Sequence, residues 1–354
     1  MSYQKVDCLI IGQGLAGSCL ALQLMEHRKT FVVFDQPHLN RASAIAAGLV
    51  NPITGRVMTK TWKADLLFPY LFSFYRNAEI SLNKKFFFPR NLYRPFLTIE
   101  EQNEWMAKSE EVELKKYVEK VFVKSTFGDQ VSDLLGGLLL KQCGYVDTLS
   151  FIEAVRGRLL ALNSYREESF KSESLKVTES HIEYDGLHAD KIIFCGGIAD
   201  AGKSYFKQLP LRPLKGEILQ IRLTQPLDHI FNRGVYVVPD HHETAYKVGA
   251  TYSTQDKTDE VSGAARRELV TKLDDLIRIP YQITHQDWGI RPTSSDRRPI
   301  MGSHPREKKI IIFNGLGTKG VSLAPYFSGQ LADWLMGEGE IDKEVSIERF
   351  YSKK

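Results

Sequence analysis

Short apolar runs and helical patterns alternate from the start of the chain. Residues 6–11 form an apolar run rich in strand-forming residues, which ends abruptly in glycine. Residues 15–26 are good helix formers with small residues on one face, and residues 30–34 form a second apolar run. Continuous apolar runs of this length are typical of buried strands. The order strand, helix, strand therefore predicts a βαβ unit in a parallel sheet.

The same two patterns continue along the rest of the chain. Between residues 211 and 251 polar and apolar positions alternate, and a polar turn at 240–244 separates two strand-like runs, 235–239 and 245–249. Residues 309–313 form a last apolar run typical of a buried strand. Helical periodicity predicts helices over residues 64–80, 100–119, 147–162, 263–277 and 322–336.

These elements predict an α/β protein in which two domains are interleaved along the chain. A Rossmann-like nucleotide-binding domain is expected from residues 1–62, 145–210 and 288–354. An antiparallel-sheet α+β domain is expected from residues 63–144 and 211–287 and could cover a ligand. A chain of 354 residues is long for one hydrophobic core and sufficient for two.

Composition and charge exclude several classes of protein. The net charge of +4 is too small to indicate nucleic-acid binding by itself. The four cysteines form no C-x-x-C pair, and the longest apolar run, residues 134–140, is far shorter than a membrane span. His241 and His242 have no third ligand nearby, so no metal site is predicted. We expect a cytoplasmic protein without a signal peptide or disulfides.

A glycine motif between the first strand and helix indicates a dinucleotide site. Gly12, Gly14 and Gly17 form G-x-G-x-x-G, in which the glycines permit a tight turn, close approach of a pyrophosphate and close helix packing. Phosphates bind at the helix N-terminus, where N–H groups point outward. Asp35 ends the second strand 18 residues after Gly17, where a carboxylate can bind the ribose hydroxyls. The motif alone does not separate FAD from NAD.

Three further segments separate the two cofactors. Residues 41–49, 288–302 and 314–325 (which include Arg41, Trp288-Gly289-Ile290-Arg291-Pro292 and Asn314-Gly315-Leu316-Gly317-Thr318-Lys319-Gly320), together with the glycine motif, resemble the D-amino acid oxidase superfamily of FAD enzymes. Glycine oxidase, sarcosine oxidase and the oxidase domain of the tRNA wobble-uridine modification enzyme belong to this superfamily. The resemblance implies FAD as cofactor. FAD is expected to be bound non-covalently, because no cysteine follows Cys195 where sarcosine oxidases attach their flavin.

The resemblance also implies which residues contact FAD. Ser43 matches the loop at the pyrophosphate and ribityl chain, residues 46–48 the stretch beside the isoalloxazine, and residues 195–197 a strand end near the adenosine. Phe170 matches a backbone contact to adenine, and residues 315–320 match the loop over the flavin pyrimidine. The residues expected to contact FAD are Gly12, Gly14, Leu15, Ala16, Gly17, Asp35, Gln36, Arg41, Ser43, Ala46, Ala47, Gly48, Phe170, Cys195, Gly196, Gly197, Arg291, Gly315, Gly317, Thr318, Lys319, Gly320 and Val321.

Three residues are candidates for binding a substrate. Arg291 matches the position at which glycine oxidase binds the substrate carboxylate, and a guanidinium grips a carboxylate in a planar, bidentate fashion. Tyr236 and Tyr252 match residues that line the substrate site of the relatives. Asp296 is expected to organise a Ser-Ser-Asp turn rather than to act in catalysis. Lys60 and Trp62 either edge the substrate site or serve capping and packing.

The sequence leaves three functions open. The first is an oxidoreductase that oxidises the C–N bond of a small amine or amino acid by hydride transfer to flavin N5, with Arg291 holding the substrate carboxylate. The second is a tRNA-modifying oxidase that acts on a carboxymethylaminomethyl wobble uridine. The third is a non-catalytic flavin-binding protein. The electron acceptor, O₂ or another compound, and the oligomeric state stay open.

Overall fold

The first apolar run lies at the centre of a mixed eight-stranded sheet in the computed structural model, which describes residues 3–36, 42–55, 58–202, 205–240, 243–256 and 258–351. Strand β1 (Gln4–Ile11) pairs in parallel with β2 (Phe31–Phe34) and with β14 (Leu187–Phe194). Strand β11 (Tyr165–Arg166) is parallel to β2, and β21 (Ile310–Asn314) is parallel to β14. The antiparallel strands of this sheet are β12 (Lys176–Val177), β13 (Ile182–Tyr184) and β20 (Ile300–Ser303), the last paired with β21.

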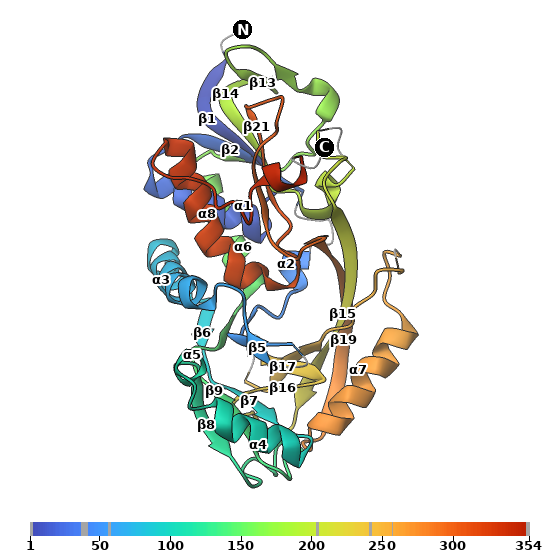
Figure 1. Cartoon of the computed structure of the whole chain (residues 1–354). Helices are drawn as coiled ribbons and strands as arrows, with labels where there is room; N and C mark the ends of the chain where they lie inside the picture. The colour runs from blue at the N-terminus through green and yellow to red at the C-terminus, as the bar shows by residue number, and fades with distance from the viewer. Residues whose placement is uncertain are drawn as a thin grey trace.

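Three helices pack together beside this sheet in Figure 1: α1 (Leu15–Glu26), α6 (Thr148–Ala161) and α8 (Gly320–Met336). Ile10 of β1 and Leu20 of α1 belong to one core cluster. On the other face of the sheet, Leu9 and Phe206 belong to a second cluster. Side chains alternate between the faces of a strand, so a strand buried on both faces needs the continuous apolar pattern seen in the sequence.

A second eight-stranded sheet is antiparallel apart from one parallel pair, β16 with β7. Its strands, in spatial order, are β19 (Tyr281–Ser294), β15 (Leu211–Leu223), β18 (Ala245–Gly249), β17 (Val235–Pro239), β16 (Ile230–Arg233), β7 (Leu92–Pro95), β9 (Gly137–Leu140) and β8 (Val118–Phe122). Helix α7 (Gly263–Leu276) packs on this sheet through Leu269 and Leu273. The α/β fold class expected from the sequence is confirmed.

The long strands β15 and β19 belong to the second sheet and extend from it toward the first sheet (Figure 1). Where β19 ends, Thr293 bridges to Leu316, which places the carboxyl end of β19 beside the segment after β21. The remaining elements are α2 (Ala42–Ile45), β3 (Leu49–Val50), β4 (Ile53–Thr54), β5 (Thr59–Lys60), α3 (Ala64–Leu82), β6 (Phe87–Pro89) and β10 (Gly144–Val146).

One expected helix is wrong in its second half. In place of a single helix over 100–119, the chain forms α4 (Ile99–Lys108), the short α5 (Val112–Lys115) and the start of β8. Tyr117 is 1% exposed and its hydroxyl donates to Asp65, and Val118 pairs with β9. The burial of Tyr117 and the pairing of Val118 with β9 stabilise this segment more than a continued helix would, despite its helical periodicity. The other expected elements are confirmed to within two residues at each end.

The division into two domains stays a prediction in its boundaries. Strand β19 runs through residues 287 and 288, so the expected boundary there falls inside one continuous strand. Within the described ranges, no helix has both the length and the apolar character needed to cross a membrane.

Candidate functional site

The turn between β1 and α1 can be formed only by glycine at two positions. Gly12 has a φ of +101°, and a Cβ there would lie 2.7 Å from the Cys195 carbonyl oxygen. A Cβ on Gly17 would lie 2.0 Å from the Gly12 carbonyl oxygen. At Gly14, by contrast, a Cβ would meet only Ser43 among the described residues, with its Oγ at 3.1 Å. Gly12 and Gly17 thus close the turn, and Gly14 leaves its backbone open to a ligand.

The N-terminus of α1 is well placed to bind an anion. Gly14 is the N-cap residue and no side chain caps the helix there, while the N–H of Leu15 donates to Ser43 Oγ at 3.1 Å. The partial positive charge of the helix end attracts phosphates. Ala16 is buried in the same first turn, and Ser43 lies on α2. The turn and Ser43 therefore lie together at the helix end where a phosphate is expected to bind.

Asp35 is buried beside this turn, 9% exposed. Its Oδ1 accepts the N–H of Gln13 at 3.0 Å, and its Oδ2 accepts the hydroxyl of Tyr165 at 3.2 Å. The sequence analysis missed Tyr165, which gives no signal of its own because it lies in the two-residue strand β11. Gln36 follows Asp35 and is half-buried, and Arg41 lies outside the described residues. Asp35 thus fixes the glycine turn in addition to its expected ribose contact.

The carboxyl end of β14 is held by two buried polar residues that the sequence analysis did not select. Gly196 donates its N–H to Asp200 Oδ2 at 2.7 Å. Asn314 donates from Nδ2 to the Gly197 carbonyl oxygen at 2.8 Å and to Asp200 Oδ2 at 2.9 Å. Cys195 pairs its N–H with the Ile11 carbonyl oxygen at 2.7 Å. These bonds bring the ends of β1, β14 and β21 to one edge of the sheet, where ligands of α/β proteins bind.

Phe170 lies on the face of the sheet away from the helices. Its ring lies 4.9 Å from that of Tyr184 and 5.3 Å from that of Phe194. Tyr184 also contacts Phe34, whose ring is 5.0 Å away and which directly precedes Asp35. Phe170 is therefore connected through Tyr184 to the strand that ends in Asp35.

Residues 46–48, which follow α2, are held in place by contacts with β10, α6 and β18. Gly48 has a φ of +65°, and a Cβ there would lie 1.8 Å from the Val146 carbonyl oxygen. The Ala46 carbonyl oxygen accepts the Thr148 hydroxyl at 3.1 Å and Lys247 Nζ at 3.3 Å. Ala47 is buried between them. Residues 46–48 are thus fixed in position, as a surface that faces a flat ring must be.

Lys247 is another residue of the candidate site that was not expected from the sequence. It lies on β18 between two apolar residues, is 6% exposed, and has Asp240 Oδ1 3.9 Å from its Nζ. Lysine is rarely buried to this degree. The signal that could have found it is a lysine in the middle of an apolar strand, Ala245–Gly249. Lys247 brings a positive charge from the second sheet to the backbone of Ala46.

The loop before α8 carries another lysine of interest, Lys319. Gly315 and Gly317 have φ values of +74° and +56°, and α8 begins directly after Lys319. Lys319 Nζ donates to Thr54 Oγ1 at 3.0 Å and to Thr61 Oγ1 at 3.3 Å. Burial, and then the charge of Arg297, lower the pKa of Lys319. Three further residues that are expected to contact FAD lie here: Thr318, Gly320 and Val321. Thr318 is exposed and Val321 is buried.

Arg291, Tyr236 and Tyr252 lie together at the junction of β15, β17 and β19. The Arg291 guanidinium lies flat against Gly216, where a Cβ would be 2.2 Å from Nη1. Its Nη1 donates to the Thr251 carbonyl oxygen at 3.3 Å, and its Cζ lies 5.1 Å from the centre of the Tyr252 ring. Tyr252 is 66% exposed. Burial raises the pKa of Tyr236 to about 12, while the positive charge of Arg291 opposes this shift.

The loop that carries Tyr252 is anchored by two buried charged residues of β15. Lys215 Nζ donates to Asp256 Oδ2 at 2.8 Å and to Thr258 Oγ1 at 2.9 Å. Glu217 Oε1 accepts the Ser262 hydroxyl at 2.9 Å. Lys215 and Glu217 are 1% and 2% exposed, so the charge of Lys215 is paired with Asp256 and the carboxylate of Glu217 is satisfied by hydrogen bonds rather than by water. These contacts hold the loop against β15, next to Arg291.

Lys60, Trp62 and Asp296 make contacts with other residues. Lys60 forms ion pairs with Asp65 and Glu113, and the Trp62 ring stacks on Phe327. These contacts favour a structural role for both.

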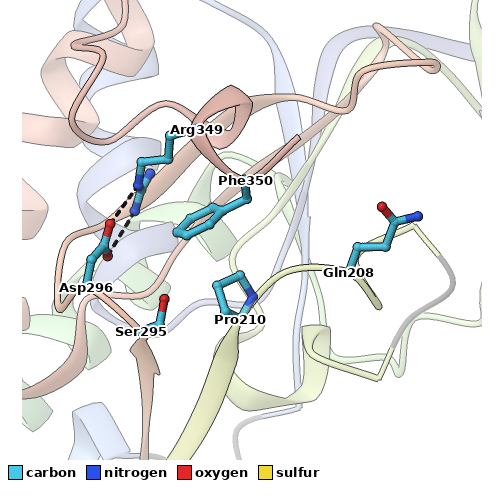
Figure 2. A pocket seen from close by; sticks show the side chains of 6 residues that line it. All are labelled: Gln208, Pro210, Ser295, Asp296, Arg349 and Phe350. Atoms are coloured by element: carbon cyan, nitrogen blue, oxygen red, sulfur yellow. Dashed lines mark hydrogen bonds and ion pairs between the residues drawn. The ribbon is translucent and has the colours of Figure 1, made fainter. Parts of the chain in front are cut away.

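Asp296 lines a separate hollow of about 500 Å³ with Gln208, Pro210, Ser295, Arg349 and Phe350 (Figure 2). It accepts from the Arg298 N–H at 3.2 Å and from Arg349 Nε at 2.8 Å. Asp296 therefore organises its turn, as expected from the sequence.

Comparison with known proteins identifies the family. A family model described as FAD dependent oxidoreductase matches residues 7–334. The bifunctional protein MnmC of tRNA 5-methylaminomethyl-2-thiouridine biosynthesis from Idiomarina loihiensis is 23% identical over 98% of this chain and 59% of its own length. A glycine oxidase from Bacillus licheniformis is 24% identical over 94% of each chain. Several of the curated relatives are longer, and the chain spans 52–59% of the length of three of them.

A solved structure agrees with the family model. The crystal structure of glycine oxidase from Geobacillus kaustophilus superposes with a TM-score of 0.80 at 19% identity, covering 97% of this chain and 98% of that one. The expected cofactor and the expected enzyme class are confirmed, because the matching family is FAD-dependent and oxidoreductive. The chain belongs to the DAO family of FAD-dependent oxidoreductases.

Proposed function

We propose that this enzyme oxidises the C–N bond of a small amine or amino acid whose carboxylate is held by Arg291. The observation that carries the proposal is that the Arg291 guanidinium has no carboxylate partner among the described residues. Within the described part of the chain, no carboxylate lies within ion-pair distance of it, and its one hydrogen bond is to the Thr251 carbonyl oxygen. A half-buried arginine without a carboxylate partner is suited to bind one from a ligand.

The two tyrosines complete the proposed substrate site. Because its pKa is about 12, Tyr236 stays a neutral hydrogen-bond donor at physiological pH. Its hydroxyl lies close to Gly249, where a Cβ would be 2.7 Å away, so only glycine leaves room for the ring. Tyr252 covers the guanidinium from the exposed side. Together, these groups would orient a small substrate by its carboxylate.

FAD fits the residues on the other side of the site. The open backbone of Gly14, the N-terminus of α1 and Ser43 would hold the pyrophosphate, and Asp35 the ribose. FAD, when bound, accepts the hydride from the substrate carbon. Residues 46–48 and the loop before α8 would exclude water from the reacting atoms. Among the described residues, the cysteines are all buried at Cys8, Cys19, Cys143 and Cys195, which supports non-covalent binding.

A second candidate is oxidation of a carboxymethylaminomethyl group on a tRNA wobble uridine. The similarity to the MnmC protein extends over 98% of this chain, which favours it. The same Arg291 would bind the carboxylate of that secondary amine. The two candidates differ in whether the group attached to the nitrogen is small or is a nucleoside at the end of a tRNA.

An anaerobic reduction series tests the proposal. Amines with and without a carboxylate, such as glycine and methylamine or sarcosine and dimethylamine, are mixed with the enzyme, and loss of the oxidised flavin absorbance is recorded. We expect bleaching by members with a carboxylate and none by their matched partners. A tRNA that carries the carboxymethylaminomethyl group is mixed with the enzyme in the same way. Bleaching only by this tRNA would favour the second candidate. Bleaching by neither group, with failure to reoxidise after photoreduction, would contradict an amine-oxidising function. Reoxidation in air then separates an oxidase from a dehydrogenase.

Replacing Lys247 with methionine is expected to slow flavin reduction by substrate about tenfold without loss of FAD. The change keeps the volume of the side chain and removes a buried charge beside Ala46. At an effective dielectric constant of about 20, a unit charge contributes on the order of 1–2 kcal/mol at a separation of roughly 8–16 Å, and about 1.4 kcal/mol corresponds to a factor of ten in rate. Stopped-flow absorbance measures the rate. Lys272→Met, on the exposed face of α7, is the matched control; an equal rate in both variants would exclude Lys247.

A further inference from the structure

The hairpin of β13 and β14 places two histidines and a glutamate together at the amino end of β14. The three residues are His181, Glu183 and His188, and one nitrogen or oxygen atom from each lies within 4.8 Å of the others. Glu183 is the direct cross-strand partner of His188, and His181 precedes Glu183 by two residues. Residues two apart on a strand, and residues directly opposite on its partner, point to the same face.

The remaining hairpin residues show why these three side chains share a face. Ile182, Tyr184, Leu187 and Ala189 are buried in the core cluster below the sheet. Because side chains alternate along a strand, the residues between them point to the opposite, more exposed face. His181, Glu183 and His188 are each half-buried on that face. The core packing therefore fixes the direction of the three side chains without using them itself.

His181 is oriented as a metal-binding histidine is. Its Nδ1 lies 2.8 Å from Ser180 Oγ, and its Nε2 lies 3.2 Å from Glu183 Oε1. Its backbone is held by Thr178, which donates to the His181 carbonyl oxygen from both N and Oγ1. A hydrogen bond to one ring nitrogen commonly orients the other toward a metal. Two ligands on a tetrahedral zinc ion lie about 3.3 Å apart, since each bond is about 2.0–2.1 Å long.

His188 supplies a second, independent observation. Its Nε2 is buried and has no hydrogen-bond partner among the described residues. The ring is held between Tyr3, with centroids 4.0 Å apart, and His181, with centroids 4.2 Å apart. A buried ring nitrogen without a partner costs free energy unless a ligand satisfies it.

We propose that His181, Glu183 and His188 bind one divalent transition-metal ion of the zinc type, with water as the fourth ligand. Two imidazoles and one carboxylate suit Zn²⁺ and its neighbours, and not Mg²⁺ or Ca²⁺, which prefer oxygen ligands. Lys176 lies 4.0 Å from Glu183, but its side chain is 77% exposed, so its charge is largely solvated. No metal site was expected from the sequence, because these three residues do not follow a known zinc-motif spacing along the chain.

The metal would lie far from the proposed FAD site and take no part in the flavin chemistry. His188 lies near the start of β14 and Cys195 follows its end, so seven residues of extended chain, roughly 23 Å, separate the metal from the proposed FAD site. A metal ion there would join β13 to β14 and hold Tyr3 over their exposed face. Metal bound only by the folded state stabilises it in proportion to the logarithm of the metal concentration.

Zinc titration of the tag-free, chelator-treated holoenzyme tests this proposal, using a chromophoric zinc indicator as competitor. We expect one Zn²⁺ per chain and a rise in the melting temperature. His188→Ala and Glu183→Gln should each weaken binding by roughly 100-fold or more, and Ser180→Ala by about tenfold. The flavin absorbance should be unchanged in all three.

Two control variants make the result specific. His285 is exposed on β19, and His27 lies 3.2 Å from Asp333 in a second histidine–carboxylate cluster. His285→Ala and His27→Ala should bind zinc as the wild type does. Absence of stoichiometric binding, binding that survives the double change Glu183→Gln and His188→Ala, or binding lost in His27→Ala would each overturn the proposal. Circular dichroism of the double variant shows whether the hairpin change has unfolded the protein.

Discussion

Replacing Asp35 with alanine is expected to release most of the FAD from the purified enzyme. The wild type should be yellow and release intact FAD on acid precipitation. In the variant, the ribose hydroxyls lose a carboxylate that accepts charge-assisted hydrogen bonds, each worth about 1.5–3 kcal/mol. Two such bonds correspond to a loss of affinity of roughly 150-fold or more. Fluorescence titration of the apoprotein with FAD measures the change.

The structure adds a second reason for a large effect. Asp35 accepts the N–H of Gln13 within the glycine turn and the hydroxyl of Tyr165. Alanine would leave both donors without this acceptor, and the turn would lose part of its support. Tyr165→Phe is the matched control, because it removes only the tyrosine contact and should keep most of the FAD. Thermal unfolding of the apoproteins separates the effects. Unchanged flavin content of Asp35→Ala after dialysis would show that Asp35 serves only the turn.

The glycine motif shows which part of the site was predictable from the sequence. The steric demands at Gly12 and Gly17 are local, because they arise where a strand turns directly into a helix. Such demands leave a pattern of fixed spacing in the sequence. The βαβ unit was predictable for the same reason, since its buried strands need continuous apolar runs. Cofactor and family followed from the motif together with the segments before and after β21.

Contacts between distant segments were not predictable in the same way. Lys247 reaches Ala46, 201 residues away in sequence, and Asp200 bonds Asn314, 114 residues away. Neither pair has a characteristic spacing, because the distance along the chain between two packed elements is arbitrary. The break in the expected helix at 100–119 has a similar cause, since Tyr117 is fixed by its burial against a distant element. Tertiary packing, which single-segment patterns do not contain, decided these positions.

Replacing Arg291 with alanine is expected to abolish carboxylate binding while FAD and its visible spectrum are retained. Removing one side of a buried, bidentate ion contact costs about 2–5 kcal/mol, which corresponds to a roughly 30- to 5,000-fold loss of affinity. The guanidinium contributes one hydrogen bond within the described protein, to the Thr251 carbonyl oxygen, so the fold should lose little. Titration with a small carboxylate, followed by flavin absorbance, measures the affinity.

Two further variants separate recognition from charge and from structure. Arg291→Lys should restore binding only in part, because lysine offers a point charge and no planar fork. Arg222→Ala, on the exposed side of the neighbouring strand β15, should bind carboxylates as the wild type does. If Arg291 were structural, Arg291→Ala would lose stability or flavin together with carboxylate binding. Equal titration curves for wild type and Arg291→Ala would remove Arg291 from the substrate site. Tyr236 and Lys319 would then be the remaining groups that could hold the substrate, the first as a neutral donor and the second as a cation whose pKa is lowered by burial.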